Sequence, residues 1–269
     1  MSDYVLGSSD EEIERLAYQN EVWSHETTGL WESAGIGIGT RVADFGCGPG
    51  FCTKALARIV GSKGHVYAVD SSEKFAAVVK SETAGASNIT FYRSDVCKTP
   101  IDDDSVDAVF ARWLFCFMGR PEDLVEEVSR VLVPGGKLVV FDYFNYLASN
   151  VYPQRPAITS IFDAFTQDVE SHGGSWDIGG ELTGMLAKSG FEIEFLTPIT
   201  RIGKPGSRVW RWVQYYAEVT LPRLIESGIW TEEQKLDFEK AWSEAAKDPA
   251  SFIFTPPMIG IVATLTIDH

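Results

Sequence analysis

The sequence predicts an α/β fold: a doubly wound, mostly parallel sheet with helices on both faces and an added helical cap. Two patterns predict this fold. Between residues 41 and 142, short apolar runs typical of buried strands alternate with segments of helical periodicity. Such alternation requires right-handed crossovers between parallel strands. At 269 residues, of which 45% are hydrophobic, the chain is also long enough to bury the core of one large domain.

The predicted strands are short and apolar, and each is followed by a turn signal or a helix. The first five are RVADF (41–45), HVYAVD (65–70), NITFYRSD (88–95), VDAVFAR (106–112) and KLVVFD (137–142). Helical segments lie between them at 51–60, about 73–84 and 121–133, the last with Leu124, Val128 and Leu132 on one face. A helix at about 181–189 and strands at 191–196 and 259–267 then complete a sheet of seven strands.

Three segments outside this rhythm predict the cap. We expect residues 1–269 to form a single domain. Its core spans about 35–142, 178–197 and 258–269, and its cap about 1–30, 143–177 and 198–257. We expect the cap to cover the carboxyl edge of the sheet, where open α/β sheets bind their ligands.

The composition disfavours several classes of partner. With 38 acidic and 23 basic residues, the formal net charge is −15, which argues against nucleic acids and anionic membranes. No apolar run approaches the roughly 18 residues of a membrane span, and the N-terminus lacks a signal pattern. We therefore expect a cytoplasmic protein. The four cysteines and four histidines show no zinc-site spacing, so no metal is expected.

The strongest local motif is VADFGCGPG at 42–50, where a strand gives way to a helix through alternating glycines. Glycines Gly46, Gly48 and Gly50 permit a sharp turn and close approach of a ligand, and the helix N-terminus can receive an anion. The alternative is a tight turn without a ligand. The GxGxG spacing after an acidic residue differs from the GxGxxG of dinucleotide-binding proteins, which disfavours a nicotinamide cofactor.

Two acidic residues follow at the ends of the next strands. Asp70 is placed to accept hydrogen bonds from both hydroxyls of a ribose, although it could instead cap the following helix. Asp95 could accept from the exocyclic amine of an adenine while the backbone of Val96 meets a ring nitrogen. For this pair the alternative is an ordinary loop cap.

The ordered motifs DFGCGPG, VYAVDSS, SDVCKTPIDDDSVDAVFARWLF and VPGGKLVVFD resemble the class I S-adenosylmethionine-dependent methyltransferases. The resemblance covers residues 40–142 and is greatest to the small-molecule branch that includes the ubiquinone and menaquinone enzymes. It implies a Rossmann-like seven-stranded sheet, S-adenosylmethionine as cofactor and methyl transfer to a small organic acceptor, such as a secondary metabolite or a quinone-like compound.

The resemblance also implies which residues contact the cofactor. The glycine loop would surround the methionine moiety, Asp70 would hold the ribose, and Asp95 with Val96 the adenine. Arg15 and its neighbours in the N-terminal stretch would contact cofactor or substrate, or merely pack a helix. The full set is Tyr4, Arg15, Gln19, Asp44, Gly46, Cys47, Gly48, Gly50, Asp70, Ser71, Asp95, Val96, Ala111 and Arg112.

The acceptor side is less defined by the sequence. Enzymes of this fold that methylate base amines carry Asn/Asp-Pro-Pro-aromatic after the fourth strand, where this chain reads ARWL at 111–114. Aromatic residues outside the core are expected to line the substrate pocket, or else to pack the cap. They are Trp113, Tyr146, Trp176, Trp210 and Tyr215. Tyr143 and His172 are the candidate catalytic residues, with His25 as a third; the acceptor atom stays open.

Two other functions remain open at this stage. The same fold could bind S-adenosylmethionine for sensing or for chemistry other than methylation. Less favoured is an oxidoreductase that uses nicotinamide. The oligomeric state is not indicated by the sequence.

Overall fold

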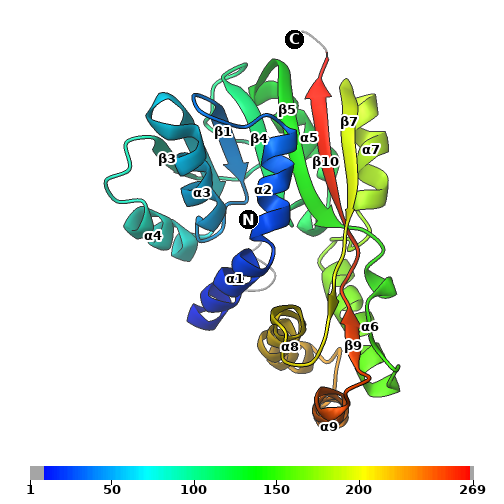
Figure 1. Ribbon diagram of the computed structural model, residues 1–269. Coiled ribbons are helices and arrows are strands. Elements are labelled where there is room, and N and C mark those ends of the chain that lie inside the picture. The colour runs from blue at the N-terminus through cyan, green and yellow to red at the C-terminus, as the bar shows by residue number, and fades with distance from the viewer. Residues whose placement is uncertain (1–8, 267–269) are drawn as a thin grey trace.

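The protein is built around a seven-stranded sheet with the strand order β3-β2-β1-β4-β5-β10-β7 (Figure 1). The computed structural model describes residues 9–266. The strands are β1 (Arg41–Phe45), β2 (His65–Asp70), β3 (Ile89–Arg93), β4 (Val106–Arg112), β5 (Leu132–Tyr143), β7 (Phe191–Ile199) and β10 (Met258–Leu265). Strand β10 runs antiparallel to both of its neighbours, β5 and β7, and the other pairs in this sheet are parallel. The predicted fold class is confirmed, and the strand order reverses between β1 and β4.

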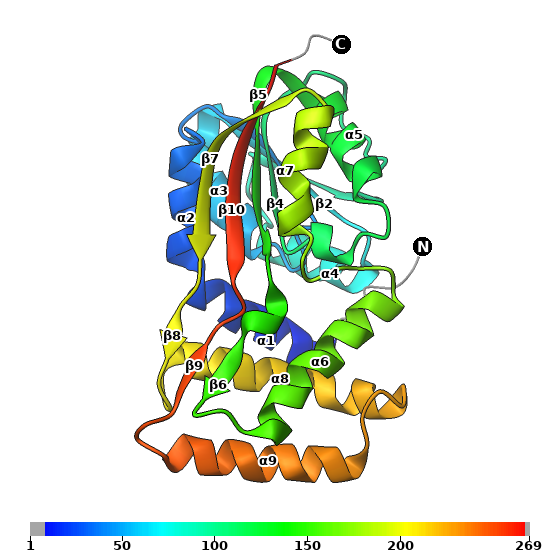
Figure 2. The ribbon, with the colours of Figure 1, turned by 90° about the vertical axis from the view of Figure 1, so that its right-hand side faces the viewer.

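Helices cover both faces of this sheet. Helices α2 (Ser24–Ser33) and α3 (Phe51–Val60) lie on one face, and α5 (Pro121–Val131) and α7 (Gly179–Lys188) lie on the other (Figures 1 and 2). Helix α4 (Glu73–Glu82) packs beside β3. Short 3₁₀ turns are η1 (Gly61–Lys63), η2 (Phe115–Phe117) and η3 (Tyr146–Ala148). In the part of the chain that is described, no helix combines the length and the apolarity needed to cross a membrane.

Helix α5 shows how the sequence produces these elements and where the prediction differs. Pro121 occupies the first turn, where its missing N–H costs nothing, and Leu124 and Val128 are fully buried on the inner face. The helix ends at Val131, earlier than expected. Leu132 instead opens β5 and pairs with Val106, so its apolar side chain is buried through the sheet.

A second layer lies beyond the carboxyl ends of the parallel strands (Figure 2). It contains α1 (Asp10–Val22), α6 (Pro156–Ser171), α8 (Arg208–Glu226) and α9 (Glu232–Lys247). A small sheet joins it, with the order β6 (Asn150–Tyr152), β9 (Phe252–Phe254) and β8 (Ile202–Gly203). These elements fall within the segments expected to form the cap. The small sheet was not expected, because strands of two or three residues leave no periodic pattern.

Helix α2 belongs to the core although most of it lies in the segment 1–30 that we expected to form the cap. Leu30 and Trp31 are buried against the sheet, and the Trp31 ring lies 5.2 Å from that of Phe110. A side-chain carbon added at Gly260 would lie 2.5 Å from Leu30, so β10 accommodates this helix by lacking one. We therefore propose a boundary between cap and core that lies between α1 and α2.

The junction between the two layers is tightly packed. Trp23 is fully buried, with its ring 6.2 Å from Phe141 of the core and 5.0 Å from Trp212 of α8. Arg201, which follows β7, lies over Trp23 at 4.9 Å and donates to Glu26 at 2.6 Å. Apolar contact and a partly buried ion pair together hold the cap on the core.

Candidate functional site

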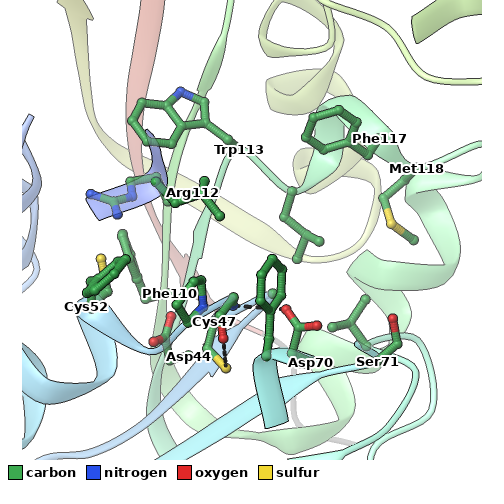
Figure 3. A pocket seen from close by; sticks show the side chains of 18 of the residues that line it. Asp44, Cys47, Cys52, Asp70, Ser71, Phe110, Arg112, Trp113, Phe117 and Met118 are labelled. Atoms are coloured by element: carbon green, nitrogen blue, oxygen red, sulfur yellow. Dashed lines mark hydrogen bonds between the residues drawn. The ribbon is translucent and has the colours of Figure 1, made fainter. Parts of the chain in front are cut away.

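A cavity of about 340 Å³ opens at the carboxyl edge of the sheet, where the strand order reverses between β1 and β4 (Figure 3). Ligands of open α/β sheets bind at such switch points. The structure brings many of the sequence-predicted residues to this cavity. They are Gln19, Asp44, Gly46, Cys47, Gly48, Asp70, Ser71, Asp95, Val96, Arg112 and Trp113.

The glycine loop leaves β1 in a left-handed backbone conformation. The backbone φ angles of Gly46, Gly48 and Gly50 are 66°, 53° and 84°. A residue with a side chain would be strained by about 1 kcal/mol or more in this left-handed region. A side-chain carbon at Gly46 would lie 2.9 Å from Leu114, whereas one at Gly48 would meet no atom within 4 Å. Gly50 is the N-cap of α3 and does not line the cavity. Gly48 thus borders open space.

Asp70 ties the loop after β2 to the glycine loop. Its Oδ2 accepts from the Gly48 N–H at 2.9 Å, and its Oδ1 accepts from the Ser72 N–H at 2.8 Å. Burial raises the pKa of Asp70 above its ordinary value. Each carboxylate oxygen has a further lone pair, so the side chain can also accept from a ligand in the cavity.

Asp44 lies beneath the glycine loop and is only 2% exposed. Its Oδ2 accepts from the Thr53 hydroxyl at 2.6 Å. Burial raises the pKa of Asp44 to about 6, although the positive charge of Arg112 opposes the rise. Arg112, at the end of β4, donates to Thr27 at 3.0 Å and to Asn20 at 2.9 Å. The Asp44 carboxyl group and the Arg112 guanidinium therefore lie near each other at the cavity.

Asp95 lies at the rim of the cavity and is exposed, whereas Val96 beside it is buried. The Asp95 Oδ1 accepts from the Cys97 N–H at 2.9 Å, which closes a local turn. The loop-cap role that we considered as an alternative is therefore present in the structure. It leaves the other carboxylate oxygen available to a ligand.

The loop after β4 holds Trp113 against the cavity in a strained conformation. Trp113 has a φ of 49°, which costs a bulky residue about 1–3 kcal/mol and persists only where neighbours enforce it. The Trp113 N–H donates to the carbonyl oxygen of Phe141 at 2.8 Å. The N–H of the next residue, Leu114, donates to the carboxylate of the fully buried Asp142 at 3.2 Å. Burial raises the pKa of Asp142 to about 6. The sequence analysis missed Asp142, although it is the acidic end of the strand KLVVFD.

Helix α1 forms one wall of the cavity through Leu16 and Gln19. Behind them, Arg15 is 2% exposed and forms a two-point ion pair with Glu12, both contacts at 2.7 Å. The Gln19 Oε1 accepts from Arg15 at 2.8 Å and from Trp212 of α8 at 3.0 Å. Arg15 thus positions Gln19 and does not itself line the cavity. Tyr4 lies outside the described residues.

An aromatic cluster forms the side of the cavity that faces the cap. Trp113 and Phe117 line the cavity, opposite Asp44 and Asp70 (Figure 3). Behind them the cluster continues through three more rings. The contacts between ring centroids are Trp113–Tyr143 at 6.2 Å, Phe117–Trp176 at 5.4 Å, Tyr143–Trp176 at 4.6 Å and Tyr146–Trp176 at 4.9 Å.

Several predicted residues are not brought to the cavity. His172 is exposed at the end of α6, where its Nδ1 lies 2.7 Å from the Asp168 carbonyl oxygen. Trp210 packs on Trp242 of α9 with a ring separation of 4.8 Å. Tyr215 lies on the outer side of α8, under Arg211. The buried Ala111 of β4 and the exposed His25 of α2 are not among the lining residues either.

The cavity is also lined by apolar residues that the sequence analysis did not select. They are Leu16, Pro49, Phe51, Cys52, Phe75, Phe110, Leu114, Phe117, Met118 and Gly119. Most of them stand within a few positions of a motif. Proximity to the motifs was therefore the available signal, but it does not separate a lining side chain from a core one.

Comparison with known families and proteins finds similarity in the core of the chain. Residues 43–140 match the model of a family described as methyltransferase domain. Demethylmenaquinone methyltransferases of Staphylococcus aureus strains JH9 and Newman are 34% identical over 126 residues, 46% of this chain and 50% of theirs. The chain thus spans about half the length of these curated relatives.

Solved structures are similar over most of the chain. A putative methyltransferase of Bacillus halodurans has a TM-score of 0.59 and 22% identity, covering 89% of this chain and 98% of its own. The cyclase SpnF has a TM-score of 0.58 and 20% identity, and the match covers 91% of this chain and 82% of SpnF. A Haemonchus contortus phosphoethanolamine N-methyltransferase, solved with S-adenosyl-L-methionine, has a TM-score of 0.57 and 15% identity. The match covers 91% of this chain and 53% of that protein. At these identities the likeness concerns the fold alone.

Proposed function

We propose that this chain, whose core belongs to the class I S-adenosylmethionine-dependent methyltransferases, binds S-adenosylmethionine in the cavity and transfers its methyl group to a small organic acceptor. One observation carries the proposal. The glycine loop, Asp70 and Asp95, which lie far apart in the sequence, border the same cavity at the switch point of the sheet.

The residues present fit this cofactor. The open space at Gly48 admits a ligand against the backbone, and Asp70 offers acceptors to the ribose hydroxyls. Asp95 and the adjacent Val96 are placed for the adenine at the rim. When bound, S-adenosylmethionine supplies a methyl group that leaves with the bonding electron pair remaining on sulfur, while an electron pair of the acceptor forms the new bond.

The charges around the glycine loop suit the amino acid end of the cofactor. Asp44, with a pKa of about 6, is largely ionised at neutral pH and can accept from an ammonium group. Arg112 can donate to a carboxylate. Burial of Asp44 beneath the loop keeps water from competing for its contact, which strengthens that contact.

The acceptor would lie against the aromatic cluster. Positioning a nucleophile in line at contact distance supplies much of the acceleration in a displacement of this kind. A quinone-like acceptor is one candidate, since the curated relatives are named demethylmenaquinone methyltransferases. The net charge of −15 disfavours polyanionic acceptors, nucleic acids included. All four cysteines are free thiols, which fits action in the cytoplasm.

A second candidate is a protein that binds the same cofactor without methylating. Its support is the similarity in fold to the cyclase SpnF, with a TM-score of 0.58. In addition, among residues 9–266 neither a histidine nor a lysine lines the cavity as a general base. Turnover separates this candidate from a methyltransferase.

The first test is calorimetric titration with S-adenosylmethionine, S-adenosylhomocysteine and NADH. We expect micromolar binding of the two adenosyl ligands and none of NADH. Incubation with S-adenosylmethionine carrying a labelled methyl group and a set of small acceptors then measures transfer. If neither adenosyl ligand binds, the cofactor assignment fails. If both bind but no acceptor is labelled, the second candidate gains support.

A further inference from the structure

Three tyrosines in the space between core and cap have hydroxyl groups without a protein partner. Tyr143 ends β5, Tyr146 begins η3 and Tyr216 lies on α8. Tyr143 is 8% exposed and Tyr146 is 4% exposed, yet neither hydroxyl makes a hydrogen bond within residues 9–266, and neither does that of Tyr216. None of these hydroxyl oxygens is among the described side-chain atoms that are sealed from solvent without a partner, so water or a ligand can reach each of them. Such groups are stabilised when a ligand or water satisfies them.

The three phenols form one group. Burial raises the pKa of Tyr146 well above its ordinary value, and the neighbouring Tyr216 and Tyr143 raise it further. Arg15 lies near all three and acts in the opposite direction on each pKa. Its guanidinium carbon is 5.4 Å from the centre of the Tyr216 ring. A phenol with an ordinary pKa of about 10 is already protonated at neutral pH, and the shifts here are upward, so the three hydroxyls can both donate and accept.

This group adjoins the cofactor cavity. The Tyr143 ring lies 6.2 Å from Trp113, nearly parallel to it, and Trp113 lines the cavity. Tyr216 packs at 4.7 Å on Phe165 of α6, so the cap supplies the opposite side. Trp113 is held in its strained conformation at the boundary between the two spaces. The three tyrosines do not line the cavity itself, so a ligand has to extend past Trp113 to reach their hydroxyls.

The charged side chains around this space already have hydrogen-bonding partners. Arg15 is paired with Glu12, and Arg223 of α8 lies 2.6 Å from Asp168 of α6. The buried Asp142 accepts from three backbone N–H groups. Asp142 has no ionic partner among the described residues, but these three N–H groups already satisfy its carboxylate. A charged ligand would have to displace existing partners to offset its desolvation, which favours a neutral ligand.

We infer that this space is the acceptor subsite, and that it selects a neutral aromatic acceptor whose oxygen substituents hydrogen-bond to Tyr143, Tyr146 and Tyr216 while its ring lies against Trp113. The inference rests on the proposed function. In the transfer, an electron pair of the acceptor forms the bond to the methyl carbon and sulfur keeps the pair of the broken bond. The proton that the acceptor loses passes to solvent water.

The test uses the full chain saturated with S-adenosylhomocysteine, so that binding is measured without turnover. Three probes share one ring system and differ in charge: 2,6-dihydroxynaphthalene, 6-hydroxy-2-naphthoate and (6-hydroxy-2-naphthyl)trimethylammonium. We expect the neutral probe to bind most tightly. Tyr143→Phe, Tyr146→Phe and Tyr216→Phe should each weaken it by roughly three- to tenfold, the loss of one hydrogen bond.

The matched control is Tyr215→Phe, one residue from Tyr216 on the same helix. Its hydroxyl lies 3.5 Å from Glu14 on the outer side of α1, so probe affinity should stay within roughly twofold of wild type. Tighter binding of the ammonium probe, no binding of the neutral probe, or Tyr→Phe variants that bind like wild type would overturn the inference. Failure of S-adenosylhomocysteine itself to bind would instead overturn the proposed function, which keeps the two outcomes distinct.

Discussion

The two sides of the cavity are built in different ways. The side that we assign to the cofactor comes from consecutive loops after β1, β2 and β3, and its polar atoms are held by bonds between neighbouring motifs, such as Asp70 to Gly48. The side that we assign to the acceptor joins Trp113, Tyr143 and Tyr216 from distant segments, packed ring against ring. Short sequence motifs therefore suffice to form the cofactor side, whereas the acceptor side depends on how distant segments pack together.

The substitution expected to reduce cofactor binding most is Gly48→Val. Its side chain would occupy the open space at the left-handed loop, so we expect affinity for S-adenosylmethionine to fall at least roughly a hundredfold. Calorimetry measures the affinity, and thermal unfolding reports any loss of stability. Gly206→Val is the matched control, because Gly206 also has a positive φ and no atom within 4 Å but lies outside the cavity. Retained affinity in Gly48→Val would remove the loop from the site.

Asp70→Asn tests the link between the two loops. The amide keeps one acceptor but loses the charge and one of the contacts to Gly48 or Ser72, so we expect cofactor affinity to fall by roughly tenfold or more. Asp102→Asn, in an exposed turn, is the charge-matched control and should bind like wild type. Equal affinities of the two variants would mean that Asp70 serves the fold alone.

The raised pKa of Asp44 predicts opposite pH effects on stability and on binding. Its ordinary pKa is 3.8 and burial raises it to about 6, so between these values the folded chain holds a proton that the unfolded chain releases. The free energy of unfolding without ligand therefore falls as pH rises through this window. A cationic ligand favours the carboxylate, so affinity should rise roughly tenfold from pH 5 to pH 7, following ionisation.

Asp44→Asn is the matched variant for both measurements. It should flatten the affinity profile and remove its share of the stability slope, while Asp142, with a pKa also raised to about 6, keeps its own share. Denaturant unfolding and calorimetry at several pH values provide the data. An affinity that rises equally in the variant would assign the pH dependence to another group.

The smallest effect is expected at the edge of the cap. His172 is exposed and its ring bonds to the backbone of its own helix, so His172→Ala should change kcat and KM by less than roughly twofold. A loss of tenfold in kcat with labelled cofactor would instead bring the loop after α6 into the reaction. That result would reopen the role that the sequence suggested for this histidine.

The sequence predicted the core well because its signals are local. The strands 41–45, 65–70 and 106–112 are found with the predicted bounds, since each is a buried apolar run closed by a turn. The position of α2 was not predicted, because a half-polar helix of ten residues can cover either a sheet or a cap. Only its contacts through Trp31 decide which.

The candidate site divides in the same way. The glycine loop, Asp70 and Asp95 border one cavity as expected, because the carboxyl ends of parallel strands meet at one edge. For the adjacent Tyr215 and Tyr216, composition offers no distinction. Their directions differ by the rotation of about 100° per residue along a helix, and only the docking of α8 on α1 and α6 shows which one faces inward.

The sequence by itself determined the α/β core, the loop that turns at Gly48 and the acidic residues at the strand ends that we assign to a nucleoside. These depend on backbone geometry and short-range periodicity, which neighbouring residues encode. Tertiary structure decided the acceptor side: the strained Trp113, the burial of Asp142 and the meeting of three tyrosine hydroxyls. Those features arise from packing between segments far apart in the chain, where side-chain volume and burial, rather than local pattern, select the arrangement.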